Sequence, residues 1–208
     1  MLDKPSEVKI SKTDVAGSEV PGAVLTLTLE KSAKTAGANL EKYVDSKVKL
    51  VDQTNKNVIT WTSTSEPMTF AQLPDGTYTL EESVAPDGYT ITDAITFEVV
   101  NGVPTTGNVV MVDELSKVTV SKQDVTGAEI PGATLILTGE KPLTNVKSET
   151  DLTVEDNKIT WTSGKTPTIL EGLPDGKYTL EESVAPDGYT ITDAIIFEIK
   201  NGVPTTEK

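Results

Sequence analysis

The chain has 208 residues and a formal net charge of −14, with no cysteine and no histidine. Its length fits two domains of about 100 residues each. The missing residue types exclude disulfide bonds, thiolate zinc sites and a histidine general base. The acidity argues against a nucleic-acid partner, because phosphate binding requires clustered lysine and arginine, and it is interpreted as a solvated surface.

The sequence holds no calcium-loop motif and no cofactor motif, so we expect neither a cofactor nor a metal ion. No apolar run approaches the length that spans a membrane, and no signal peptide follows Met1. We therefore expect no membrane insertion of this fragment. If the protein is secreted and anchored, its signal and anchor lie outside the sequence.

Short alternating segments separated by turn signals predict an all-β fold made of two tandem immunoglobulin-like β-sandwiches. A helical turn is expected within the connection after the second strand, at Ala38–Tyr43. Proline, aspartate and glycine mark two tight turns, at Pro74–Gly76 and Pro86–Gly88. In the first copy the expected strands are Val8–Lys12, Ala23–Leu29, Lys47–Val51, Val58–Trp61, Thr77–Glu82, Ile95–Val100 and Val109–Asp113.

The chain repeats itself, which predicts two domains, 1–114 and 115–208. The segments Tyr78–Ile95 and Tyr178–Ile195 are identical. The first copy has a longer connection between its second and third strands. The second copy contains no counterpart of the last strand, so domain 2 is expected to lack it. Residues 1–5 resemble the end of such a last strand from a preceding module.

Period-two alternation places charged residues at the ends of three inward-facing apolar series. These residues are Lys12, Glu82 and Asp113, and the second copy repeats the first two as Lys122 and Glu182. A single inward charge is usually a strand end that reaches solvent. Three on three strands, two of them repeated in register, favour a buried cluster.

Such a cluster suggests a specific reaction. Burial raises the pKa of a carboxyl and lowers that of an amine, which favours a neutral lysine beside a protonated glutamic acid. The amine is then a nucleophile, and the acid polarises the aspartyl carbonyl and shuttles the proton. The product is a Lys–Asp amide formed with loss of water. The reaction occurs once within the chain, so we do not expect an enzyme that acts on other molecules.

Four segments strongly resemble Cna protein B-type (CnaB) domains: V-K-I-S-K-T-D, the P-G-A that opens the second strand, Y-T-L-E-E-S-V-A-P-D-G-Y, and V-V-M-V-D-E. One such domain is that of a streptococcal fibronectin-binding protein from which SpyTag and SpyCatcher were made. The resemblance covers nearly the whole length of both copies. It implies a transthyretin-like sandwich with an intramolecular isopeptide bond. Lys12 then corresponds to the amine, Glu82 to the catalytic acid and Asp113 to the acceptor.

The second copy departs from this pattern. Glu182 matches the catalytic position, and Lys122 is an amine without an acceptor in its own domain. One interpretation is that the fragment ends one strand early. A second hypothesis is that Asp3 of a neighbouring chain completes domain 2 and bonds to Lys122, which gives head-to-tail assembly.

The resemblance implies a structural stalk repeat of a Gram-positive surface adhesin, extracellular and anchored to the cell wall. Its expected partners are neighbouring repeats of the same polypeptide and a host matrix protein bound through a distal domain. An alternative is that the modules themselves bind matrix protein. Aromatics make up only 5% of the chain, and Trp61 and Trp161 occupy equivalent places, which favours a core role. A hydrolase using Glu81 and Glu82 is disfavoured because strand neighbours face opposite sides, and no motif supports a small-molecule carrier.

Overall fold

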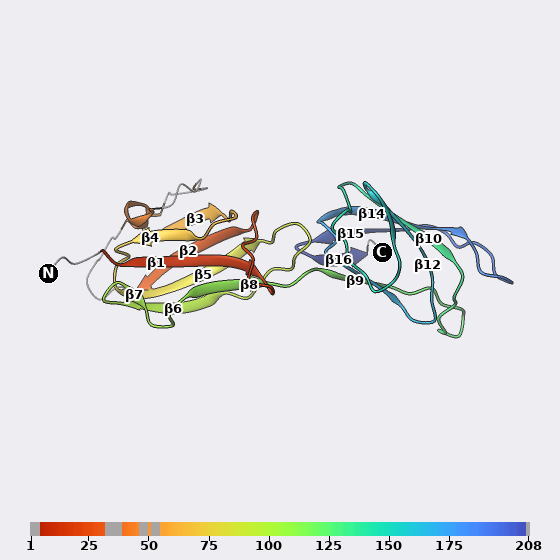
Figure 1. Ribbon diagram of the computed structural model, residues 1–208, viewed down its shortest axis with the longest axis horizontal. Helices are drawn as coiled ribbons and strands as arrows, with labels where there is room; N and C mark the ends of the chain where they lie inside the picture. Colours follow the sequence, from red (N-terminus) through yellow and green to blue (C-terminus); the bar gives the residue numbers. More distant parts are fainter. Residues whose placement is uncertain (1–4, 32–38, 46–49, 51–54, 207–208) are drawn as a thin grey trace. The chain divides into compact units, whose positions relative to one another are not determined.

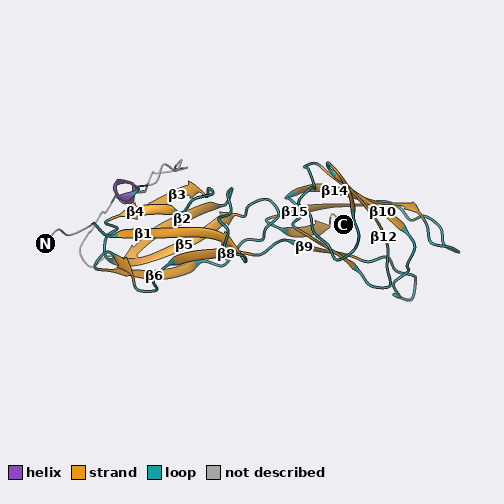
Figure 2. Ribbon diagram, in the orientation of Figure 1, coloured by secondary structure: helices purple, strands orange, loops and turns teal. Residues whose placement is uncertain are grey.

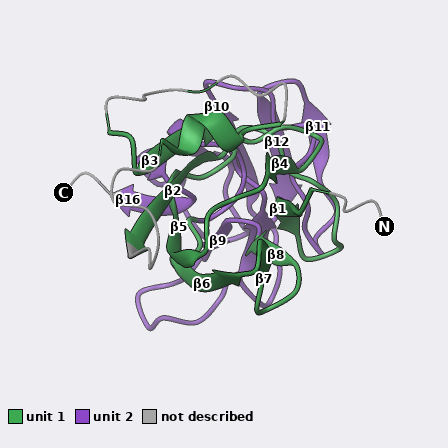
Figure 3. Cartoon of the chain, turned by 90° about the vertical axis from the view of Figure 1, so that its left-hand side faces the viewer, with its two compact units in different colours: residues 1–86, 91–114 green, residues 87–90, 115–208 purple. Residues whose placement is uncertain are grey.

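The computed structural model describes residues 5–31, 39–45, 50 and 55–206. It separates into two compact units, Met1–Pro86 with Ile91–Glu114, and Asp87–Thr90 with Leu115–Lys208 (Figure 3). We refer to them as domain 1 and domain 2. Regular structure is almost entirely strand, which confirms the predicted all-β fold with two tandem sandwiches (Figure 2). Within the described ranges, no helix has the length and apolar character needed to cross a bilayer.

Domain 1 consists of two facing sheets. The smaller has the order β4-β1-β8 and the larger the order β3-β2-β5-β6-β7 (Figure 1). The predicted helical turn is present as a 3-10 helix, η1. The strands and the turn are β1 Glu7–Asp14, β2 Val24–Lys31, η1 Leu40–Tyr43, β3 Val58–Thr62, β4 Met68–Ala71, β5 Gly76–Val84, β6 Ile95–Val100, β7 Val103–Pro104 and β8 Val109–Asp113.

The core of domain 1 is built by alternate residues from the two sheets, as the period-two pattern requires. Trp61 lies edge-on to Phe70 at 6.2 Å between ring centroids, and Tyr78 stacks on Phe97 at 5.6 Å. Trp61 is only 2% exposed and Trp161 only 3%. The core role predicted for both tryptophans is confirmed.

The first and last strands of domain 1 pair directly, and they run parallel. In the register of β1 and β8, Lys12 lies opposite Met111, and Asp14 lies opposite Asp113. Side chains two residues apart on a strand share a face, so Asp113 is the diagonal neighbour of Lys12 on the inner face. The pairing brings together two residues from opposite ends of the domain sequence.

Domain 2 repeats the larger sheet in the order β11-β12-β10-β14-β15-β16. Its second sheet consists of β13 and β9, and none of the described residues takes the place that β8 has beside β1. The strands are β9 Lys117–Val120, β10 Thr134–Gly139, β11 Thr153–Glu155, β12 Lys158–Thr162, β13 Thr168–Glu171, β14 Gly176–Val184, β15 Ile195–Lys200 and β16 Val203–Thr206.

Two short strands of domain 1, β4 and β7, were not predicted. They have only four and two residues, and each is defined by its pairing with β1 or β6 rather than by a long local pattern. The strand predicted at Lys47–Val51 lies outside the described residues except for Leu50, which forms an isolated bridge with Trp61.

Candidate functional site

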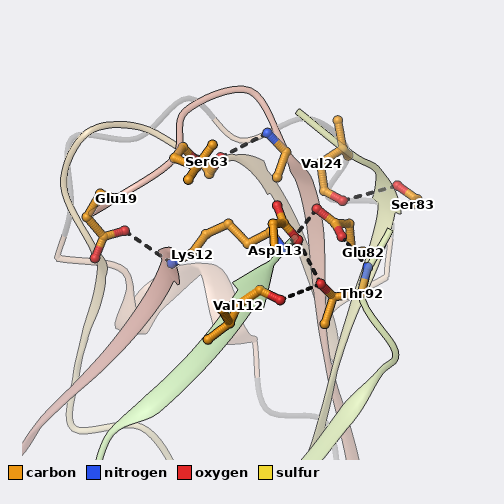
Figure 4. A network of polar contacts seen from close by, with 11 residues as sticks. Lys12, Glu19, Val24, Ser63, Glu82, Ser83, Thr92, Val112 and Asp113 are labelled. Carbon is orange, nitrogen blue, oxygen red and sulfur yellow. Dashed lines mark hydrogen bonds and ion pairs between the residues drawn. The ribbon is translucent and has the colours of Figure 1, made fainter. Parts of the chain in front are cut away.

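Three predicted residues meet at one end of the domain 1 core (Figure 4). Lys12 Nζ donates a hydrogen bond to Asp113 Oδ1 and lies 3.1 Å from Glu82 Oε1. The lysine side chain is 1% exposed, and both carboxyl side chains are fully buried. The structure therefore brings together all three residues that the strand patterns singled out in domain 1.

Local strand geometry explains why each side chain points inward. Along β5 the buried residues are Tyr78, Leu80 and Glu82, whereas Glu81 is exposed. Along β8 the buried residues alternate in the same way and end in Asp113. Each charged group is thus the last inward position of an apolar strand face, which is where the core meets a connecting loop.

Thr92 is a member of the network that the sequence reasoning missed. It lies in the loop between β5 and β6, and its backbone N–H donates to Glu82 Oε2 at 2.8 Å. Its hydroxyl oxygen lies 2.7 Å from Asp113 Oδ1 and 2.7 Å from the carbonyl oxygen of Val112. The only sequence signal was the T-I-T-D segment that both copies share.

The environment of this cluster raises the pKa of Glu82 above its ordinary value. Burial raises the pKa of Glu82, and the nearby charge of Asp113 raises it further. The backbone N–H of Thr92 and the Lys12 ammonium oppose this shift without cancelling it. Within the part of the chain that the structure describes, Asp113 Oδ2 has no hydrogen-bond partner. A buried carboxylate oxygen without a partner is costly, and forming an amide would remove one oxygen of this carboxyl.

Domain 2 retains two members of the cluster. Lys122 Nζ lies 3.3 Å from Glu182 Oε1, and the side chains are 11% and 2% exposed. The backbone N–H of Thr192 donates to Glu182 Oε2 at 2.8 Å, and its hydroxyl donates to the same oxygen at 3.2 Å. The amine and the acid are therefore assembled as in domain 1.

A cavity of about 310 Å³ adjoins this pair, with Val120, Leu180 and Ile195 among its apolar walls. Burial raises the pKa of Glu182, but the backbone N–H of Thr192 and the Lys122 ammonium outweigh burial, so the pKa lies below its ordinary value. The pKa of Glu82 shifts in the opposite direction. In domain 1 the strand β8 covers the site, so burial is the stronger effect.

The remaining site predictions have different outcomes. Asp3 lies outside the described residues. No described carboxylate other than Glu182 forms an ion pair with Lys122. Among the described residues, no group of three or more acidic side chains is placed to hold a metal ion.

Comparison with known families defines the class of protein. Residues 6–114 and 116–208 each match the model of the SpaA family, described as a prealbumin-like fold domain. The chain belongs to this family and contains two of its domains in tandem. This confirms the predicted transthyretin-like sandwich, whereas the narrower resemblance to CnaB domains stays a prediction. The comparison with curated protein sequences returned no match.

Several solved structures are similar to the chain. A streptococcal ancillary pilin is 21% identical with a TM-score of 0.39, over 94% of this chain and 58% of the pilin. The TIE protein of Bacillus anthracis is 24% identical with a TM-score of 0.43, over 95% of this chain and 32% of that protein. A C-terminal fragment of the pilus adhesin SpaC from Lactobacillus rhamnosus GG is 18% identical with a TM-score of 0.43, over 97% of this chain and 85% of that fragment. The chain thus spans less than two thirds of the first two.

Proposed function

We propose that domain 1 is a self-crosslinking structural module in which Lys12 and Asp113 form an isopeptide bond with Glu82 as the catalytic acid. The observation that carries the proposal is the buried contact of the Lys12 amine with both carboxyl groups. A buried ammonium between two carboxylates is costly as an ion cluster, because desolvation penalises every charge. Condensation to a neutral amide removes two of the three charges.

The protons balance without an external reagent. A Lys12 ammonium transfers one proton to Glu82, whose raised pKa favours accepting it. The neutral amine attacks Asp113 Cγ, so the N–C bond forms and one C–O bond breaks. Of the three ammonium hydrogens, one stays on the amide nitrogen and two leave with the departing oxygen as water. Glu82 carries both and ends as the carboxylate that it was at the start.

The bond gives a mechanical advantage to a module that is pulled at its ends. The two residues are 101 positions apart, so the amide closes nearly the whole domain into a loop. By the loop-entropy estimate made for disulfides, a loop of this size stabilises the fold by about 4–5 kcal/mol. Tension that enters through β1 passes directly to β8, and the strands between them are not loaded. The bond thereby slows unfolding under tension, and unlike a disulfide it contains no thiol-derived link that a reductant could break.

The role that fits this chemistry is a stalk repeat on the outer surface of a Gram-positive bacterium. Neighbouring repeats of the same polypeptide are its first partners, and a distal domain binds the host matrix. Membership of the SpaA prealbumin-like family supports a module of this kind. Direct matrix binding by these two domains is the alternative. It predicts saturable binding of purified matrix proteins to the isolated chain.

The test is the intact mass of the purified chain beside two pairs of variants. We expect the wild-type mass to be one water below the calculated value, and Lys12→Ala and Glu82→Ala to have the full mass. The matched variants Lys122→Ala and Glu182→Ala should still lack one water, because domain 2 contributes no bond by itself. A wild-type chain of full mass would contradict the proposal.

A second candidate function concerns domain 2, and the cavity beside Lys122 and Glu182 favours it. In domain 1 the corresponding space is occupied by Met111 and Asp113 of β8, which are 1% and 0% exposed. A strand with the β8 pattern, supplied by another polypeptide, would pair with β9 and place its aspartate beside Lys122. The Asp3 segment of a neighbouring chain is one such source and would give head-to-tail assembly.

A peptide with the sequence of residues 107–114 tests this second candidate. We expect the chain to gain the peptide mass less one water, with the new amide at Lys122. The Lys122→Ala variant and a peptide with alanine in place of its aspartate should form no adduct. Covalent ladders in the absence of peptide would indicate Asp3 as the acceptor. No adduct and no ladder would contradict the hypothesis.

A further inference from the structure

We propose that Thr92 is a further catalytic residue of the crosslinking reaction, and that its hydroxyl group stabilises the oxyanion that forms on Asp113. The inference rests on the proposed function of domain 1. It concerns a residue in a loop, outside the three strands that carry the lysine, the glutamate and the aspartate. Figure 4 shows Thr92 beside the two carboxyl groups, in contact with both.

The two polar groups of Thr92 serve different partners. The backbone N–H donates to Glu82 Oε2, so the other glutamate oxygen, Oε1, faces Lys12 Nζ. The hydroxyl oxygen lies 2.7 Å from Asp113 Oδ1, within the distance range required of a donor to an oxyanion. One residue thereby fixes the proton carrier and the electrophile relative to each other.

The hydroxyl has one hydrogen and two acceptors. The carbonyl oxygen of Val112 is also 2.7 Å away, so the hydrogen is shared between a neutral carbonyl and the Asp113 carboxyl. When the amine attacks Asp113 Cγ, negative charge develops on Oδ1, and the hydrogen bond to Oδ1 strengthens. An interaction that is stronger in the transition state than in the ground state accelerates the step.

The same contact distinguishes the two oxygens of Asp113. Oδ1 accepts from Thr92 and Lys12, whereas Oδ2 has no partner among the described residues. Oδ1 is therefore retained as the amide oxygen, still hydrogen-bonded to the threonine. Oδ2 is the atom that takes two protons through Glu82 and leaves as water.

Domain 2 provides an internal control for this geometry. The segments around Thr92 and Thr192 have the same sequence, and both backbone N–H groups bind the local glutamate at 2.8 Å. The Thr192 hydroxyl, however, donates to Glu182 at 3.2 Å. The hydroxyl is thus aimed at an aspartate only where β8 supplies one, so its placement in domain 1 is a property of the assembled site.

The experiment follows bond formation in newly made protein. Chains from cell-free translation are quenched in acidic denaturant at timed intervals, and the fraction that has lost one water is read from the intact mass. We expect Thr92→Val to slow water loss on the order of 10²-fold, as for removal of one oxyanion donor. Thr92→Ser, which keeps the hydroxyl, should react within a few-fold of wild type. Thr96→Val, the same change at an exposed β6 position, should have no effect.

A pH profile separates this role from a loss of structure. The valine variant keeps the backbone N–H to Glu82, so the pH dependence of the rate should keep its shape while every rate falls. A displaced profile would mean that Glu82 had moved, which overturns the assignment. Once both chains have reacted to completion, Thr92→Val and wild type should have unfolding midpoints within a few degrees of each other. If the wild-type chain loses water and Thr92→Val is equally fast, only the role of Thr92 fails. If the wild-type chain loses none, the proposed function itself fails.

Discussion

Domain 1 and domain 2 contain the same amine and the same glutamate at the ends of equivalent strands, yet the two sites differ in environment. The side chain of Lys12 is 1% exposed, and that of Lys122 is 11% exposed. Leu80 is fully buried, whereas Leu180 is partly exposed at the wall of a cavity. The same amine and glutamate are therefore not sufficient to create the same environment.

The directions of the pKa shifts show what β8 adds. In domain 1 burial dominates and raises the pKa of Glu82, whereas in domain 2 hydrogen bonds and the nearby ammonium dominate and lower the pKa of Glu182. A single strand, β8, supplies Asp113 and covers the pair formed by Lys12 and Glu82. The same strand thus brings Asp113 to the amine and reverses the direction in which the pKa of the glutamate shifts.

The largest effect is expected from removing the amine of domain 1. Lys12→Met leaves two buried carboxyl groups without their cation, at a cost of about 3–5 kcal/mol. It also abolishes the crosslink, which contributes about 4–5 kcal/mol more. We expect domain 1 to lose its hydrogen-exchange protection and to unfold far below the wild-type temperature.

Lys122→Met is the matched variant in domain 2. Its ion pair borders a cavity and forms no crosslink, so we expect a smaller loss than for Lys12→Met, confined to domain 2. Equal losses of protection in the two variants would contradict the difference between the sites. Hydrogen exchange monitored by mass spectrometry assigns each loss to its domain.

A gain of function should follow from giving domain 2 a strand with the β8 sequence. We suggest replacing residues 207–208 with the sequence of residues 107–114, so that an aspartate follows Thr206 at the spacing found in domain 1. The intact mass should then be two waters below the calculated value. Domain 2 should gain about 4–5 kcal/mol from loop closure. A deficit of only one water would mean that some feature besides β8 separates the two sites.

The smallest predicted effect is a pH dependence at Glu182. Its folded-state pKa lies below the ordinary value of 4.5, so its contribution to stability is present above that pH and is lost as the pH falls through the folded-state pKa. We expect Glu182→Gln to destabilise domain 2 by about 1 kcal/mol near neutral pH. The difference from wild type should shrink below pH 4.5. Urea unfolding at several pH values measures it.

The opposite sign applies to unreacted domain 1. The pKa of Glu82 is raised, so its contribution to stability is present below the ordinary value of 4.5 and is lost as the pH rises through the folded-state pKa. A Glu182→Gln variant whose difference from wild type grew on acidification would mean that the two glutamates share one environment, contrary to the two sites described here.

The sequence by itself determined the all-β fold, the repeat and the inward positions of Lys12, Glu82 and Asp113. These follow from local rules, because period-two alternation and turn residues act over a few neighbours along the chain. The same rules predicted that Lys122 and Glu182 would recur in domain 2. They also indicated that a counterpart of Asp113 was missing there.

Only the tertiary structure decided which of these groups meet and in what environment. The parallel pairing of β1 with β8 joins residues that are 101 positions apart, and no local pattern specifies that register. The contribution of Thr92 was invisible for the same reason, since its loop carries no strand pattern and its partners come from β5 and β8. Desolvation depends on everything packed around a group, so the opposite pKa shifts of Glu82 and Glu182 arise from two domains with nearly the same local sequence.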